Sequence, residues 1–387
     1  MAAIDVPEPA FMLDEEIVMF RDAVGRFLDQ HAPPARVASW REAGQVERAF
    51  WSEAGAAGML GVSVPAEYGG AGGDFRHDLV LVDQVARKGI EGFAVSLHNV
   101  IVTPYIQLHG TEEQKQRWLP KLASGARVAA IAMSEPGAGS DLQSIRTTAL
   151  KDGNGYRING SKTFISNGQI ADFIVVVAKT DPSLGARGVS LMIVETDEVE
   201  GFRRGKKLDK IGLEAQDTSE LFFDDVWVPA DNLLGDEEGR GFIQLMAELP
   251  RERLLMAVTG VITMEQAIET TIGYTRDRQA FGQPLLALQN TQFKLAECKS
   301  KATVARVFVN DCIARALEGT LDATTSAIAK QWVTDAEWEV VDECLQLHGG
   351  YGYINDYPIA HMFRNSRIQR IYGGSNEIMK VLIARSL

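Results

Sequence analysis

IAMSEPGAGS (residues 131–140) and KTFISNG (residues 162–168) are the two stretches from which the fold of this chain can be read. Both are rich in small residues, hydroxyl groups and backbone N–H donors. The turn signal Asp152-Gly153-Asn154-Gly155 lies between them, so they are expected to bracket a β hairpin. Side by side, the two stretches could form one wall of a pocket for a planar, phosphorylated cofactor.

The residues around these stretches have the period of β strands. Val189, Leu191 and Ile193 recur at every second position, and residues 173–178 form a continuous apolar run. Alternation of this kind is typical of half-buried strands, and a short apolar run is typical of a buried one. A β domain is therefore predicted over residues 126–235.

On both sides of the β region the apolar period is that of helices. Near the start, Ile17, Phe20 and Val24 step by three and four, until the pattern breaks at Pro33-Pro34. After Gly241 the helical period returns, and long helices with glycine stops are typical of an antiparallel bundle. The order helix, strand, helix is not that of a Rossmann fold, so the glycines within residues 137–139 are not a dinucleotide fingerprint.

Size and charge limit the kinds of protein this chain can be. Its 387 residues exceed the size at which one core usually stops growing, so an α+β protein of more than one domain is expected. The net charge of −13 argues against nucleic acid as a partner, because phosphate binding relies on Lys and Arg.

Membrane and metal functions are not predicted either. The sequence contains no run of about 20 apolar residues, and residues 1–16 are acidic without a basic-then-apolar signal pattern. We therefore expect no stable membrane association, and either a cytoplasmic protein or a mature chain that has lost a leader. The three cysteines have no CxxC or Cys/His spacing that indicates a metal site.

Four separated motifs resemble those of the acyl-CoA dehydrogenases, most closely the long-chain branch. They lie at residues 134–141, 278–282, 346–350 and 371–380, in the family's order, and the resemblance covers nearly the whole chain. It implies an N-terminal helical domain (1–125), a middle β domain of barrel-like or sandwich-like form (126–235) and a C-terminal four-helix bundle (236–387). It also implies a homotetramer, built as a dimer of dimers, with one FAD per subunit.

The reaction of such an enzyme needs a base for the α-hydrogen of an acyl thioester, while flavin accepts the β-hydrogen as hydride. In most relatives the base is a Glu in a Tyr-Glu-Gly turn near the C-terminus, and here that position is Gly373. The long-chain and isovaleryl branches carry the carboxylate in the helix that begins the C-terminal domain. Glu252, within Pro250-Arg251-Glu252-Arg253, matches that motif, and we assign it as the catalytic base.

The alternative for Glu252 is an ordinary acid in the first turn of a helix that Pro250 introduces. The absence of an acid at Gly373 favours the catalytic assignment. The helix N-terminus would lower the pKa of Glu252, and an apolar pocket would raise it. We expect burial to prevail once substrate is bound, because a base must work near neutral pH.

The resemblance also implies the residues that bind FAD, for which a plain β core is the alternative in the middle domain. The flavin ring and the adjoining polar groups would contact Met133, Ser134, Gly139, Ser140, Phe164, Ile165 and Ser166. The pyrophosphate and adenosine would be held by Arg278, Phe281 and Gln289 of one subunit and by Gln346, Leu347, Gly349 and Gly350 of a neighbour. Ser375, Asn376 and Glu377 would close over the cofactor, although Glu377 could be a first-turn acid of the last helix.

The acyl-CoA substrate is expected to contact a further set of residues. These are Ser140, Arg187, Pro250, Arg251, Arg253, Gly373 and Gly374. The backbone N–H of Gly373 would donate a hydrogen bond to the thioester oxygen. Alternatively, Ser140 is a cap, and the two glycines only permit positive φ in a tight turn.

Together these features predict α,β-dehydrogenation of a medium-chain, long-chain or branched acyl-CoA to the trans-2-enoyl-CoA, with electrons passed to an electron-transferring flavoprotein. Two alternatives are an acyl-CoA oxidase or monooxygenase of the same design and a non-catalytic acyl-CoA-binding protein. Glu252 argues against the second. Chain length depends on packing near Phe93, Leu97 and Ile101, which the sequence does not define.

Overall fold

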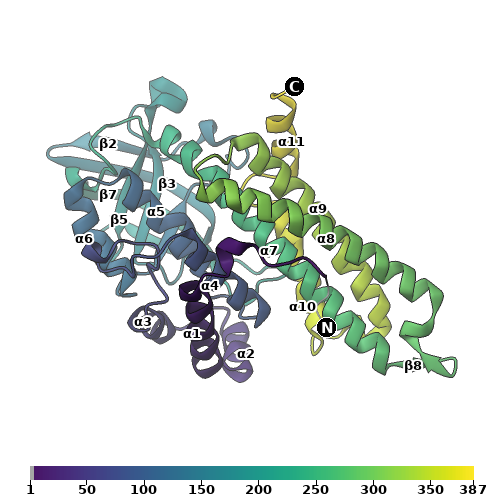
Figure 1. Ribbon diagram of the computed structural model, residues 1–387. Helices are drawn as coiled ribbons and strands as arrows, with labels where there is room; N and C mark the ends of the chain where they lie inside the picture. The colour runs from purple at the N-terminus through teal and green to yellow at the C-terminus, as the bar shows by residue number, and fades with distance from the viewer. Residues whose placement is uncertain (1–3) are drawn as a thin grey trace.

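A curled β sheet built from the middle of the chain joins a group of short helices before it to a set of much longer helices after it (Figure 1). This arrangement is seen in a computed structural model that describes residues 4–387. The predicted α+β class and the order helix, strand, helix are confirmed. The predicted boundaries at residues 125/126 and 235/236 stay a prediction, and the first three residues of the predicted N-terminal domain lie outside the described residues.

The N-terminal helices pack around large aromatic side chains. The helices are α1 (Glu15–His31), α2 (Pro34–Ala43), α3 (Arg48–Ala56), α4 (Phe75–Arg87), α5 (Thr103–His109) and α6 (Glu112–Ala123), with a π-helical segment at Ser96–Val102 before α5. The predicted stripe on α1 is buried at Ile17 and Val24, against a core that includes Trp40 and Trp51. The first helix ends at His31, where the proline pair begins, as the sequence predicts.

The sheet follows as a set of mostly antiparallel strands. They are β1 (Ala129–Ala132), β2 (Thr148–Asp152), β3 (Gly155–Ser166), β4 (Phe173–Lys179), β5 (Val189–Glu195), β6 (Phe202–Lys207) and β7 (Thr218–Pro229). The predicted hairpin is β2–β3, closed by the pair Asp152 and Gly155. Beyond it β3 pairs with β7 and β7 with β6, while β4 pairs with β5 and, in parallel, with β1. All of β5 is buried, so its alternation in the sequence does not mark a solvent face.

An irregularity in β3 shapes the site. The register between β3 and β7 shifts between Lys162 and Ile165, and Phe164 within the shift has φ +60°. A positive φ is uncommon outside glycine and turns the side chain away from its regular strand direction. The Phe164 ring is 69% exposed as a result.

The C-terminal part is built on long helices that run side by side (Figure 1). The elements are α7 (Gly241–Asp277), α8 (Gln289–Leu317), α9 (Ala323–His348), α10 (Pro358–Ser366) and α11 (Asn376–Ala384), with a small hairpin, β8 (Gln279–Ala280) and β9 (Gln283–Pro284), at the far end of α7. Cys298, Cys312 and Cys344 are buried and free between the helices. Among residues 4–387, no helix is both long and apolar enough to cross a bilayer.

Candidate active site

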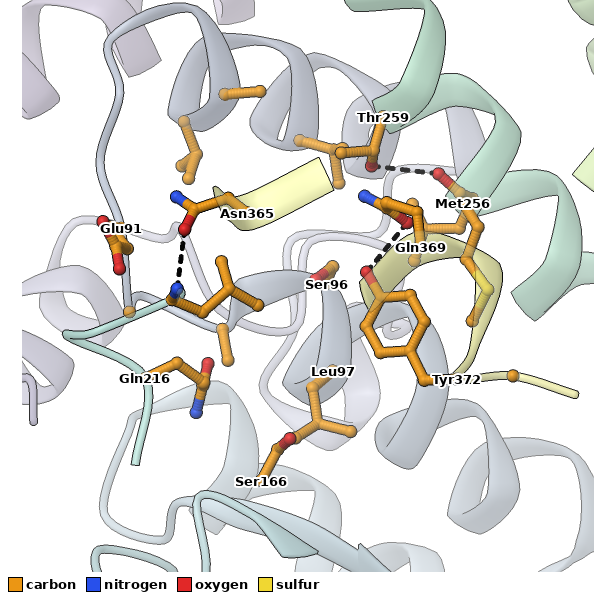
Figure 2. Close-up of a pocket in the computed structure, with 18 of the residues that line it drawn as sticks. Glu91, Ser96, Leu97, Ser166, Gln216, Met256, Thr259, Asn365, Gln369 and Tyr372 are labelled. Atoms are coloured by element: carbon orange, nitrogen blue, oxygen red, sulfur yellow. Dashed lines mark hydrogen bonds between the residues drawn. The ribbon is translucent and has the colours of Figure 1, made fainter. Parts of the chain in front are cut away.

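A cavity of about 1110 Å³ lies where the N-terminal helices, the sheet and α7 meet (Figure 2). The segment before α5 contributes Ser96 and Leu97, and α7 contributes Met256 and Thr259. Phe93, Leu97 and Ile101, whose packing is expected to limit the length of the acyl chain of the substrate, all line the cavity. Groups from all three regions of the chain therefore reach the cavity.

The two stretches that the sequence singles out form one wall of this cavity. The wall residues are Ile131, Met133, Ser134, Gly139, Ser140, Phe164, Ile165 and Ser166. The two stretches are joined directly, since the Thr163 N–H donates to the Ser134 carbonyl at 3.0 Å. The exposed Phe164 ring, beside small residues and hydroxyls, fits a planar cofactor ring better than a closed β core, so the residues present fit a flavin.

A buried ion pair supports this wall from behind. Lys162 is fully buried, and its Nζ donates to the Met133 carbonyl at 3.0 Å, the Val177 carbonyl at 2.7 Å and Oε1 of Glu135 at 2.9 Å. Burial lowers the pKa of Lys162 to about 8, and Glu135 opposes the shift. Lys162 belongs to the quoted sequence, but nothing in the sequence indicated that its side chain points inward.

Glu252 lines the cavity from α7 and is 5% exposed. The Tyr105 hydroxyl donates a 2.8 Å hydrogen bond to its Oε1. Burial raises the pKa of Glu252 to about 7, with a further rise from Glu248; the Tyr105 hydrogen bond opposes the shift, as do the neighbouring arginines to a smaller extent. A carboxyl group with a pKa near 7 is suited to general base catalysis at neutral pH.

The structure corrects the expected position of Glu252 in its helix. Because α7 begins at Gly241, Glu252 lies in the helix interior and Pro250 does not mark the first turn. The dipole effect on which the expectation relied fades within the first turn. Burial consequently raises the pKa of Glu252 without any substrate in the cavity.

The residues beside Glu252 divide between the cavity and the protein interior. Arg253 lines the cavity, is 6% exposed, and has an Nε without a hydrogen-bond partner within residues 4–387. Burial lowers the pKa of Arg253. Arg251 is instead paired with Asp78 at 3.3 Å and lies over the Phe75 ring. Neither Pro250 nor Arg251 is brought to the cavity.

The turn at Gly373 and Gly374 closes the cavity opposite the sheet, with φ of +64° and +89°. A Cβ on Gly373 would collide with the Met256 side chain, so both the positive φ and the close approach favour glycine here. The turn is held by Lys330, whose Nζ donates to the Gly374 carbonyl at 2.9 Å and to Oδ1 of Asn376 at 2.8 Å. Asn376 is thus engaged with α9, and Ser375 and Glu377 do not line the cavity.

The remaining predicted residues lie elsewhere. Arg278, Phe281, Gln289, Gln346, Leu347, Gly349 and Gly350 gather at the far end of the long helices. Arg278 lies over the Tyr351 ring there, and Phe281 is 91% exposed. With a rise of 1.5 Å per residue, this end of α7 is about 40 Å from Glu252. Arg187 lies in the turn Pro182–Gly188, also outside the cavity.

Tyr105, Lys330 and Glu337 are near or in the site and were missed from the sequence. Each lies in a helix without a motif around it, and each is distant in sequence from Glu252. Within residues 4–387, no group of three or more His, Cys, Asp and Glu side chains could hold a metal ion.

Comparisons with known proteins find the same family in three successive parts of the chain. Residues 14–126, 130–226 and 239–387 match the families described as the acyl-CoA dehydrogenase N-terminal, middle and C-terminal domains. The long-chain specific acyl-CoA dehydrogenase of Sus scrofa mitochondria is 45% identical over 371 residues, which cover 95% of this chain and 86% of that protein.

Solved structures show the same likeness. An acyl-CoA dehydrogenase from Geobacillus kaustophilus is 46% identical, with a TM-score of 0.95 over 98% of this chain and 99% of that one. A glutaryl-CoA dehydrogenase from Mycobacterium smegmatis, solved in complex with FADH2, is 28% identical, with a TM-score of 0.90 over 100% of this chain and 97% of that one.

Proposed function

The chain belongs to the acyl-CoA dehydrogenase family of FAD-dependent oxidoreductases, and from this premise we propose that it converts a medium-chain, long-chain or branched acyl-CoA to the trans-2-enoyl-CoA with Glu252 as the base. One observation carries the proposal. Glu252 is a buried carboxyl in the cavity, with a pKa of about 7, while the opposite turn presents only Gly373 and Gly374.

The proposed chemistry divides between the cofactor and the chain. FAD, when bound, accepts the hydride from the β-carbon. Glu252 takes the α-proton at a carboxylate oxygen, and its pKa near 7 keeps a substantial ionised fraction at neutral pH while allowing it to hold the proton afterwards. Tyr105 fixes the orientation of this carboxylate through Oε1.

The Gly373-Gly374 turn is proposed to bind the thioester. A backbone N–H at Gly373 that donates to the thioester oxygen would stabilise the negative charge that develops there as the proton leaves. Lys330 supports this role, because it holds the turn through the Gly374 carbonyl. Ser140 and Arg253, both on the cavity, are proposed to contact the CoA part.

FAD binding is proposed to need two copies of the chain. Met133, Ser134, Phe164, Ile165 and Ser166 would contact the flavin ring from one subunit. Because Arg278, Phe281 and Gln289 lie at the same end of the long helices as Gln346, Leu347, Gly349 and Gly350, we propose that both sets bind the pyrophosphate and adenosine of a neighbouring subunit's FAD, in place of the expected division between two subunits. This arrangement agrees with exposed apolar side chains at that end and along α8: Phe281, Phe293, Val304 and Val307. Such sharing requires at least a dimer; the family resemblance implies a homotetramer, built as a dimer of dimers, and sedimentation of the holoenzyme tests it.

Two other functions compete with this one. An oxidase or monooxygenase would reoxidise rapidly in air, and a non-catalytic binder would not be reduced at all. In the proposed dehydrogenase, the electrons pass to an electron-transferring flavoprotein. Cytoplasmic location stays a prediction.

The deciding experiment is anaerobic titration of the holoenzyme with acyl-CoAs of four to eighteen carbons. We expect the flavin absorbance to bleach, with slow reoxidation in air and fast reoxidation by an electron-transferring flavoprotein. Glu252→Gln should bind FAD and slow bleaching by about 10²–10⁴-fold, the range of general base catalysis. Glu339→Gln is the control, because its exposed carboxyl is paired with Lys301 and lies outside the cavity. Normal turnover by Glu252→Gln would remove the proposed base.

A further inference from the structure

Polar side chains line the cavity beyond Glu252, where a hydrocarbon chain alone would favour an apolar lining. Glu252, Met256, Thr259 and Thr263 line the cavity from one face of α7, each three or four positions after the last, among other lining residues of this helix. At 1.5 Å per residue, Thr259 and Thr263 lie about 10 and 16 Å along the helix from Glu252. A chain that extends from Glu252 along α7 must be long to reach these two residues. Figure 2 shows Thr259 above the pair formed by Gln369 and Tyr372.

Glu337 lines this part of the cavity from α9, and the Thr263 hydroxyl is the neighbouring group that acts on its carboxyl. It is 1% exposed, and neither carboxyl oxygen has a hydrogen-bond partner among residues 4–387. It packs closely against α7, since a Cβ on Gly260 would lie 3.0 Å from its Oε2. Burial raises the pKa of Glu337 to about 8, with the nearby Thr263 hydroxyl in opposition. At neutral pH the group is an uncharged acid with one O–H donor.

We call this part of the cavity the recess. The other hydroxyl groups that line it, on Thr259, Thr263 and Tyr372, already donate their protons. Thr259 donates to the Leu255 carbonyl and Thr263 to the Thr259 carbonyl, each at 3.0 Å. Tyr372 donates to Oε1 of Gln369 at 2.9 Å. These hydroxyl oxygens can still accept a hydrogen bond, whereas the acid of Glu337 can both donate and accept. The recess thus suits a group that donates and accepts at once.

We propose that the recess formed by Glu337, Thr259, Thr263, Gln369 and Tyr372 binds a hydroxyl group carried along a long acyl chain, so that hydroxylated long-chain acyl-CoAs are preferred substrates. This inference rests on the proposed acyl-CoA dehydrogenase function. A plain hydrocarbon would leave at least one carboxyl oxygen of Glu337 buried without a partner, since the Thr263 hydroxyl can serve only one of them, and this is unfavourable. A carboxylate on the chain would face the acid of Glu337 and repel it once ionised.

The test compares kcat/KM for a saturated long-chain acyl-CoA with that for chain-matched substrates that carry a single hydroxyl at successive positions. For the wild-type holoenzyme we expect a preference of about tenfold or more at the hydroxyl positions that reach Glu337, and little at the others. Glu337→Leu should abolish the preference, and Glu337→Gln, which can still donate and accept, should keep part of it. Flavin content establishes that each variant is folded.

Glu339→Leu is the matched control, because it removes a carboxyl group from the same helix that is exposed and paired with Lys301. It should keep the wild-type preference. The proposal is overturned if no hydroxyl position is preferred by the wild type, as expected for a recess that holds only water, or if the preference survives in Glu337→Leu. Octanoyl-CoA distinguishes failure of this inference from failure of the proposed function. If octanoyl-CoA still bleaches the flavin, only the hydroxyl-binding recess is rejected. If no acyl-CoA bleaches the flavin, the dehydrogenase function is rejected as well.

Discussion

The hydroxyl of Tyr105 donates a hydrogen bond of 2.8 Å to Oε1 of Glu252, and this contact ties α5 of the N-terminal region to α7. Both side chains are buried. Burial raises the pKa of Glu252 and the Tyr105 hydrogen bond lowers it, so the two effects together leave the carboxyl near a pKa of 7. The N-terminal helices therefore tune the proposed base and do more than enclose the substrate.

Tyr105→Phe should shift the acid limb of the pH profile of kcat/KM to higher pH. The variant removes a hydrogen bond that favours the ionised carboxylate, so a smaller fraction of Glu252 is ionised at pH 7. A hydrogen bond to a charged group contributes about 1.5 to 3 kcal/mol, which corresponds to a shift of about one pH unit or more. The loss of activity should shrink above the new pKa.

Tyr68→Phe is the control for this shift, because Tyr68 also donates to a carboxylate, at 2.9 Å to Glu112, outside the cavity. Its profile should match the wild type. An unmoved acid limb in Tyr105→Phe would mean that Glu252 does not control the profile.

Gly373→Ala should reduce turnover strongly while the protein still folds. The variant must adopt φ +64°, and the flexible end of the Met256 side chain, which lines the cavity, must move to make room for the new Cβ. A left-handed conformation alone costs about 1 to 2 kcal/mol for a residue with a Cβ. We expect a fall in kcat/KM of more than tenfold, measured with the preferred acyl-CoA.

Gly319→Ala isolates the backbone part of this effect, since Gly319 has φ +70° with open space around its Cβ position. It should lower stability but not kcat/KM. Met256→Ala added to Gly373→Ala should recover part of the lost activity. If the double variant is no better than Gly373→Ala, the collision with Met256 is not the cause.

Much of the fold could be predicted because periodicity reports burial directly. The α1 stripe at Ile17 and Val24, the β2–β3 hairpin and the long C-terminal helices all follow from local spacing. The neighbourhood of Ser134 and Phe164 could be predicted as well, since both stretches were expected in one cofactor wall, and the Thr163 N–H joins them to each other at the Ser134 carbonyl.

The contacts that tune the site could not be predicted in this way. Tyr105 and Glu252 are 147 residues apart, and neither side chain marks the other in the sequence. Pro250 was misleading, because proline favours the first turn of a helix and yet here lies well inside α7. Lys330 and Glu337 look like solvent-facing charges of an ordinary helix. Only the packing of α9 against α7 and the Gly374 turn makes them buried.

Lys330→Met should weaken both the turn and the fold. Lys330 is fully buried, and its loss leaves the Gly374 carbonyl without this donor and Oδ1 of Asn376 with only the Thr334 hydroxyl, at 3.3 Å. Each buried polar group left unpaired costs about 1 to 3 kcal/mol. We expect a lower unfolding midpoint in urea and a rise in KM for acyl-CoA, because the turn proposed to bind the thioester loses its support.

Lys301→Met removes a lysine of the same length whose partner, Glu339, is exposed. It should change stability by no more than about 0.5 kcal/mol, as usual for a surface pair. Equal effects of the two variants would show that Lys330 contributes as a surface charge does.

Glu337→Gln should become progressively more stable than the wild type as pH rises from about 5 to about 8.5. Burial raises the pKa of Glu337 from 4.5 to about 8, so between these values the folded protein holds a proton that the unfolded chain releases. Wild-type stability must then fall with increasing pH across this window, whereas the amide does not titrate. Glu252 titrates equally in both proteins, so its contribution cancels in the difference.

The measurement is the free energy of unfolding of both holoenzymes in urea at several pH values. The full shift sets an upper limit of a few kcal/mol on the gain, reached only above pH 8. Glu339→Gln, with its exposed carboxyl, should show no such trend. A difference between Glu337→Gln and wild type that stays flat with pH would require Glu337 to ionise normally, and an ionised carboxylate so deeply buried would in turn need a cation or ordered water beside it.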